Sequence, residues 1–221
     1  MHVVVNAATS ADGKLSSRRR EQIKISGPED FDRMDRIRAA ADAVRVGVGT
    51  VLADDPHLVL DVEDRRVQRL KNGRPGNPAR VVADSRARTP VDARILDDEA
   101  VTYLLVADVA PDDRVAALEA AGAVVVRAGE ERVDLAAGLA ELESRDVERL
   151  MVEGGGELIF SLFAADLVDE LSLYVGSLVI GGRDAPTLAD GEGFVDRDEF
   201  PRLELDEVER FDDGVVLHYT V

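Results

Sequence analysis

The chain contains no cysteine and only three histidines among its 221 residues. The absence of cysteine excludes disulfides, thiolate catalysis and cysteine-based metal sites. His2, His57 and His218 are scattered without the spacing of metal ligands, so we predict no metal site. No apolar run approaches the ~20 residues that a membrane-spanning helix requires. The N-terminus has no basic flank and no cleavage-like site, which favours a cytoplasmic protein without a membrane partner.

Basic residues are scarce: 27 Lys and Arg stand against 45 Asp and Glu, giving a formal net charge of -18. A nucleic-acid-binding protein needs a basic face, so this balance argues against a nucleic-acid partner. The acidic surplus is spread along the chain, as on a solvated surface, and lysine occurs only at Lys14, Lys24 and Lys71. This composition resembles that of cytoplasmic proteins from extreme halophiles, and an ordinary acidic protein is the alternative.

The chain is long enough for one large domain or two small ones, and 45% hydrophobic residues supply ample material for a core. No linker rich in Pro and Gly divides it, and we find no internal repeat. We therefore predict a single domain over residues 1–221.

Apolar runs of strand type alternate with helical patterns through the middle of the chain, and two strands pair at its end. This order predicts an α/β fold with a mixed, mostly parallel sheet, helices on both faces and an antiparallel C-terminal edge. Residues 61–78 are polar and predict an exposed loop. The expected strands are 3–8, 43–46, 80–84, 101–107, 123–126, 149–152, 170–180, 203–211 and 215–221, and the expected helices are 28–41, 51–53, 111–121, 133–142 and 158–163.

The segment Glu153-Gly154-Gly155-Gly156-Glu157-Leu158 is the most informative one, because it joins an apolar strand to a helix. Three glycines let the backbone approach a ligand closely. The helix start behind them offers free N–H groups and a partial positive charge, which suit a phosphate. Glu153 stands at the carboxyl end of the strand, where open α/β sheets place ligand chemistry. A phosphate cradle beside a carboxylate indicates a nucleotide-dependent enzyme.

Residues 47–50, Gly-Val-Gly-Thr, form half of a dinucleotide-binding fingerprint. Leu52 occupies the position of the third glycine, and no acid follows at the expected distance. Taken alone, the segment favours a tight strand-to-helix turn with Thr50 as the cap.

Two further segments have a functional and a plain interpretation each. The small residues of 6–15 would let a flat ring lie on the backbone, or they only lead into the Asp12-Gly13 turn. Arg18-Arg19-Arg20 with Lys24 is the one basic cluster near the N-terminus. It would bind a substrate phosphate, or it is solvated surface.

Taken together, these segments resemble one family, the riboflavin-pathway reductases: the reductase domain of the bifunctional deaminase–reductase and its stand-alone archaeal counterpart. The resemblance covers nearly the whole chain, and the pairing of the 47–56 block with the Glu153 and triple-glycine block is specific. The matching segments are Asn6 to Lys14, Ser26-Gly27, Arg38-Ala39, Ala43 to Pro56, Arg80 to Arg86, Val152 to Leu158, Asp169 to Leu171 and Gly181-Gly182.

The resemblance implies a dihydrofolate-reductase-like three-layer fold, a homodimer and NADPH as hydride donor, with NADH left open. It implies reduction of the ribosylamino side chain of a phosphorylated diaminopyrimidine, by hydride transfer to C1′ of the ring-opened imine. The implied cofactor contacts are Ala8, Thr50, Asp54, Gly155, Gly156, Glu157 and Leu158. The implied substrate contacts are Ser26, Gly27, Arg38, Ser85 and Glu153, of which Glu153 is the catalytic candidate that would hold or relay a proton.

The chain departs from bacterial members of the family at two positions. Those members tend to carry Lys where this chain has Asn6, and Arg where it has Asp61. A carboxylate cannot bind phosphate, so that contact passes to Arg18, Arg19 or Lys24. No deaminase zinc motif is present, so only the reduction step is implied. Two alternatives remain open: a dihydrofolate-type reductase acting on a pterin, and a non-catalytic nucleotide-binding protein.

Overall fold

The computed structural model describes residues 1–21 and 23–221. The chain forms two compact units, one made of residues 35–151 with Met1 and the other of residues 2–34 and 152–221. The unit boundaries fall within helix α1 (Pro28–Ala40) and strand β6 (Arg149–Gly154). That residues 1–221 act as one domain stays a prediction.

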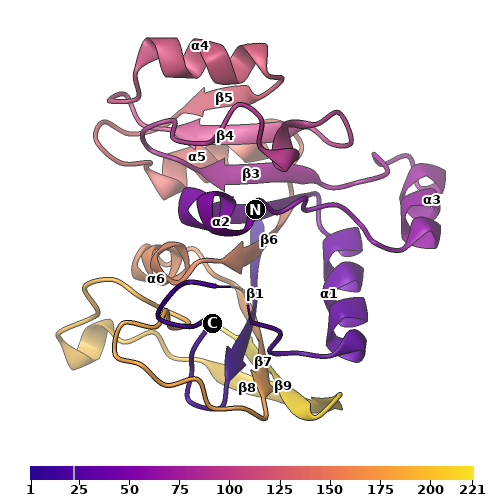
Figure 1. The fold of residues 1–221 in the computed structure, drawn as a ribbon, viewed down its shortest axis with the longest axis vertical. Coiled ribbons are helices and arrows are strands. Elements are labelled where there is room, and N and C mark those ends of the chain that lie inside the picture. The colour runs from indigo at the N-terminus through magenta and orange to yellow at the C-terminus, as the bar shows by residue number, and fades with distance from the viewer. Residues whose placement is uncertain (22) are drawn as a thin grey trace. The chain divides into compact units, whose positions relative to one another are not determined.

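The first unit contains four strands that pair in parallel, in the order β2-β3-β4-β5. Its helices follow or precede these strands, as in βαβ units. Gly138 lets α5 approach this sheet closely, because a Cβ there would lie 2.9 Å from the Leu105 side chain. Figure 1 shows these elements. They are β2 (Ala43–Gly47), α2 (Val48–Asp54), α3 (Glu63–Lys71), β3 (Ala79–Ala83), the 3-10 turn η1 (Arg94–Leu96), β4 (Thr102–Val106), α4 (Asp112–Ala120), β5 (Val124–Arg127) and α5 (Leu135–Glu143).

Helix α3 corrects the prediction of an exposed loop over residues 61–78. Its sequence, EDRRVQRLK, has only two apolar residues, Val67 and Leu70, which are too few to form the apolar stripe of a core-facing helix. Arginines hold it instead: the buried Arg69 donates to the backbone oxygens of Ala39 (2.8 Å) and Ala41 (2.7 Å), and Arg65 pairs with the buried carboxylate of Asp35 at 2.6 Å. These contacts depend on chain segments about 30 residues away, which local sequence cannot reveal.

The second unit has a mixed sheet in which β1 (His2–Ser10) and β7 (Glu170–Gly176) pair in parallel. The hairpin of β8 (Glu204–Phe211) and β9 (Gly214–Thr220) adds two antiparallel strands, with β9 next to β7. This unit also holds α6 (Gly156–Ala164) and the 3-10 turn η2 (Arg197–Glu199). Parallel pairing with an antiparallel C-terminal edge confirms the predicted sheet.

Strand β7 ends at Gly176, four residues before the predicted end at Ile180. The backbone of Ile25 lies against this point, since a Cβ on Gly176 would be 2.6 Å from the Ile25 carbonyl oxygen. Ile25 also joins Tyr174 and Val216 in a buried cluster against which Ala8 packs. Tyr174 is therefore a core residue. Searched over residues 1–21 and 23–221, no helix has both the length and the apolar character to cross a membrane.

Candidate active site

The predicted site residues are divided between the two units. Four of them, Arg38, Thr50, Asp54 and Ser85, belong to the first unit. The others belong to the second: Ala8, Ser26, Gly27, Glu153, Gly155, Gly156, Glu157 and Leu158.

The glycine turn in the second unit joins β6 directly to α6. Gly154 adopts φ +133°, a value that L side chains rarely adopt, and nothing lies within 4 Å of where its Cβ would be. Gly155 precedes the helix in an extended conformation, and no side chain caps the helix there. The Leu158 N–H already donates to the Gly155 carbonyl at 3.0 Å. The helix start therefore offers the backbone N–H groups before Leu158, beside an open glycine, as an anion cradle requires.

Side chains around this turn differ in their placement. Leu158 is buried and points into the core, while Glu157 is exposed in the first turn of α6. Gly156 is needed for packing, because a Cβ there would clash with the carbonyl oxygen of Thr187. Its own carbonyl accepts the N–H of Asp190 at 3.1 Å. Glu153 is half-buried at the carboxyl end of β6, just before the glycines.

The N-terminal strand of the second unit carries a buried polar clamp that the sequence did not indicate. Arg33 of α1 donates to Asn6 of β1 at 2.9 Å and to Ser172 of β7 at 2.6 Å. Its Nε atom donates to Asp30 at 2.8 Å. Asn6 and Ala8 share one face of β1, because side chains two residues apart point to the same side. The clamp thus brings a guanidinium to the position where bacterial relatives were expected to carry lysine.

Ser26 and Gly27 immediately precede α1, and the hairpin turn lies against Gly27. Asp212 accepts hydrogen bonds from the backbone N–H groups of Glu29 (3.2 Å) and Asp30 (3.1 Å). These N–H groups belong to the first helical turn and have no acceptor within the helix. A Cβ on Gly27 would clash with the Asp212 carboxyl group. The start of α1 is thereby neutralised by the protein's own carboxylate and is unsuited to bind an anion.

In the first unit, helix α2 begins one turn earlier than predicted. Gly47 is its N-cap, so Thr50 is not the cap but lies within the first turn. Thr50 and Asp54 are four residues apart and share one face of this helix. Burial raises the pKa of the Asp54 carboxyl. The two predicted cofactor contacts therefore present a hydroxyl and a carboxyl on the same side.

Arg38 and Ser85 each fasten a loop of the first unit. Arg38 donates to the Val59 carbonyl at 3.1 Å, and the Ser85 hydroxyl accepts the Val133 N–H at 3.0 Å. Next to Ser85, the buried Asp84 accepts both the N–H and the hydroxyl of Thr89. These bonds fix the chain just after the carboxyl end of β3.

Another group in the first unit combines residue types that ligate metals. His57, Asp97 and Glu99 each place a ligand atom within 4.8 Å of the others. Asp97 also accepts a hydrogen bond from the buried Arg80 at 2.8 Å. Although burial opposes it, the hydrogen bonds to Asp97 hold the pKa of this carboxyl below its ordinary value. A guanidinium already compensates the carboxylate, so the geometry fits a salt-bridge network.

Comparison with solved structures first defines the class of fold. A pyrimidine reductase-like protein from Corynebacterium diphtheriae has a TM-score of 0.86 at 20% identity, over 99% of this chain and 91% of that one. Dihydrofolate reductase from Enterococcus faecalis, solved with NADP(H), has a TM-score of 0.51 at 11% identity, over 99% and 95% of the two chains. The chain therefore has the dihydrofolate-reductase-like α/β fold that was predicted.

Sequence comparison then identifies the family. The model of the RibD C-terminal domain matches residues 1–217, and the chain belongs to this family. The 2,5-diamino-6-ribosylamino-4(3H)-pyrimidinone 5′-phosphate reductase of Archaeoglobus fulgidus is 48% identical over 213 residues, which are 96% of this chain and 94% of the relative. The predicted resemblance is confirmed.

Proposed function

We propose that this protein reduces the ribosylamino side chain of 2,5-diamino-6-ribosylamino-4(3H)-pyrimidinone 5′-phosphate to the ribitylamino form, a step of riboflavin biosynthesis. The observation that carries this function is the 48% identity over 96% of the chain to a relative named for that reduction. The carboxylate and the open glycine turn at the end of β6 supply chemistry that such a reaction needs.

The residues fit a nicotinamide cofactor. When bound, NADPH, or NADH in its place, supplies the hydride. Backbone N–H groups of Gly155, Gly156 and Glu157 would hold phosphate at the start of α6, where the helix dipole adds a partial positive charge. Leu158 would contribute through its place in this turn, since its own N–H is used within the chain.

The other proposed cofactor contacts come from two elements. Thr50 and Asp54 of α2 would hold polar groups of the cofactor, because they offer a hydroxyl and a carboxyl on one helix face. Ala8 of β1 has a side chain small enough for a flat ring to lie against the strand.

The substrate side of the reaction needs positioning and one proton. The ring-opened substrate carries an imine at C1′; hydride adds to that carbon and a proton ends on the nitrogen. Glu153 would hold this proton near the imine, which a nearby carboxylate makes easier to protonate. Arg38 and Ser85 would face the sugar-phosphate part of the substrate, and Ser26 would contact the substrate through its hydroxyl. Holding both partners at near-attack distance without water supplies much of the remaining rate.

The cellular setting is part of the proposal. The acidic, lysine-poor composition supports a cytoplasmic enzyme adapted to high salt, and the family resemblance supports a single reductase domain acting as a homodimer.

The test is NADPH oxidation by the purified full chain, followed at the absorbance of the reduced cofactor. We expect turnover with the phosphorylated ribosylamino-pyrimidine and none with dihydrofolate. Faster turnover of dihydrofolate would favour a pterin reductase. NADPH binding without turnover of either compound would favour a non-catalytic nucleotide-binding protein. Parallel assays with NADH establish which cofactor is preferred.

A further inference from the structure

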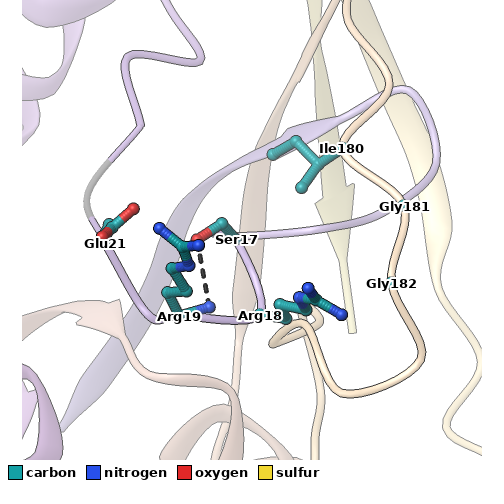
Figure 2. A pocket seen from close by; sticks show the side chains of 7 residues that line it. All are labelled: Ser17, Arg18, Arg19, Glu21, Ile180, Gly181 and Gly182. Carbon is teal, nitrogen blue, oxygen red and sulfur yellow. Dashed lines mark hydrogen bonds between the residues drawn. The ribbon is translucent and has the colours of Figure 1, made fainter.

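A cavity of about 460 Å³ opens on the second unit, and its lining includes Arg18 and Arg19 of the basic run near the N-terminus. Two chain segments that are about 160 residues apart in sequence line it (Figure 2). The lining residues are Ser17, Arg18, Arg19, Glu21, Ile180, Gly181 and Gly182.

The cavity is basic although the protein is strongly acidic. Arg18 and Arg19 are exposed, and among residues 1–21 and 23–221 neither guanidinium has a hydrogen-bonding or ion-pairing partner. Glu21 is the one acidic residue of the lining, so the lining carries a net charge of +1 in a chain of -18. Two free guanidinium groups on one cavity are suited to a phosphate, which they bind through charge-assisted hydrogen bonds.

The opposite wall is a fixed backbone turn. Gly181 and Gly182 adopt φ values of +66° and +92°, so beyond the Ile180 side chain this wall is bare backbone that a ligand can reach (Figure 2). The Asp12 carboxylate accepts the N–H groups of Ile180 at 3.0 Å and Gly181 at 2.7 Å. The hydroxyl of Ser10 donates to the same carboxylate at 2.6 Å. The turn is thus tied to the end of β1 before any ligand arrives.

The segment that follows this turn also reaches the glycine turn at the start of α6. Leu15 donates its N–H to the Pro186 carbonyl at 2.9 Å, and Lys14 forms a β-bridge with Thr187. Thr187 in turn packs against Gly156. The cavity and the proposed cofactor cradle therefore belong to the same unit, and residues 181–187 connect them along the chain.

We propose that this cavity binds the 5′-phosphate end of the substrate. Arg18 and Arg19 donate to the phosphate oxygens, while Glu21 and the Ser17 hydroxyl accept from hydroxyl groups of the neighbouring sugar chain. The ligand class is a phosphorylated polyol or sugar, in which an anion and several hydroxyls stand side by side. This assignment rests on the proposed function and adds to it the anchor that sets specificity for the phosphorylated substrate.

The kinetic test compares the double variant Arg18→Gln/Arg19→Gln with Arg20→Gln. Arg20 belongs to the same basic run but does not line the cavity, so Arg20→Gln is a control for the loss of a positive charge from this run. We expect the double variant to raise KM for the phosphorylated substrate at least tenfold with kcat within twofold of wild type. KM for the dephosphorylated substrate stays unchanged, and the control stays within twofold throughout. Equal losses for both substrates, or an equal loss in the control, would overturn the proposal.

A binding test separates this proposal from the proposed function. Ribitol 5-phosphate and ribitol are titrated into the wild-type chain and into the same variants by calorimetry, in molar KCl. We expect ribitol 5-phosphate alone to bind, with its affinity lost in the double variant and kept in Arg20→Gln. This measurement needs no turnover. A protein that is inactive but binds ribitol 5-phosphate through Arg18 and Arg19 would refute the proposed reaction and still support the proposed phosphate site. If the wild type does not bind ribitol 5-phosphate, the proposal that this cavity binds phosphate is refuted.

Discussion

The buried Arg33 gives the sharpest prediction for stability. Its guanidinium donates to Asp30, Ser172 and Asn6 over distances of 2.6–2.9 Å. Arg33 and Asp30 are only 5% and 4% exposed, so water cannot replace these bonds. The substitution Arg33→Met keeps most of the apolar stem and removes every donor. It leaves the Asp30 carboxylate without its ion-pair partner, and Asn6 and Ser172 lose one bond each.

The expected cost follows from this burial. Removing one partner of a buried ion pair costs about 3–5 kcal/mol, because the remaining charge is uncompensated. A domain of ordinary stability unfolds with only about 5–15 kcal/mol, so Arg33→Met should remove a large share of the total. Adding Asp30→Asn to Arg33→Met removes the carboxylate charge that the single variant leaves unpaired. The double variant should therefore regain more than half of what the single variant loses.

The assay is urea unfolding followed by circular dichroism, because urea is uncharged and leaves the ionic strength constant. Arg202→Met is the control, since Arg202 is exposed in the loop before β8. The control should change the unfolding free energy by less than ~0.5 kcal/mol. A loss below about 1 kcal/mol for Arg33→Met would refute the reasoning, as would a double variant no more stable than the single one.

Four further predictions concern the glycine turn, the carboxylate of Glu153, pH and salt. Gly155→Val should weaken NADPH binding, measured by fluorescence titration, far more than it lowers the Tm, since a β-branched side chain covers the N–H donors; unchanged affinity would mean that the glycines only shape a turn. Glu153→Gln should lower kcat about ten- to a thousandfold with little change in cofactor Kd, and turnover within twofold of wild type would leave Glu153 structural. A hydrogen bond from Ser10 and backbone N–H groups lower the pKa of Asp12 from 3.8 to about 2. Its stabilising effect is complete above pH 3.8 and is lost as the pH falls toward 2, so the stability gap between wild type and Asp12→Asn should close over that range; a gap independent of pH contradicts this. Because the protein has a formal charge of -18, its Tm should rise by several degrees between ~0.01 M and ~1 M KCl, as the Debye length falls from ~30 to ~3 Å. Comparison with a kosmotropic salt at equal ionic strength separates charge screening from stronger apolar burial. A Tm that does not change with KCl would refute the halophilic interpretation.

The sequence alone determined the elements whose signals are local. Pro28 and the acids behind it mark the start of α1, and Asp212-Asp213-Gly214 marks the hairpin turn. The strand–glycine–helix unit around Glu153 was readable because an apolar run, three glycines and a helical pattern follow one another directly. These features depend on backbone preferences and on neighbours a few residues away.

Only the tertiary structure decided the features held by distant polar contacts. Helix α3 exists because Arg69 and Arg65 bind groups about 30 residues away, without an apolar stripe. Arg33 meets Ser172 across 139 residues, and Asp212 caps a helix that begins 184 residues earlier at Pro28. From the sequence, the basic run at Arg18 indicated either a phosphate site or solvated surface. The turn at Gly181 and Gly182, which makes it a cavity, comes from the other end of the chain. Hydrogen bonds and charges are satisfied in three dimensions, so the spacing of residues in sequence carries no record of these partners.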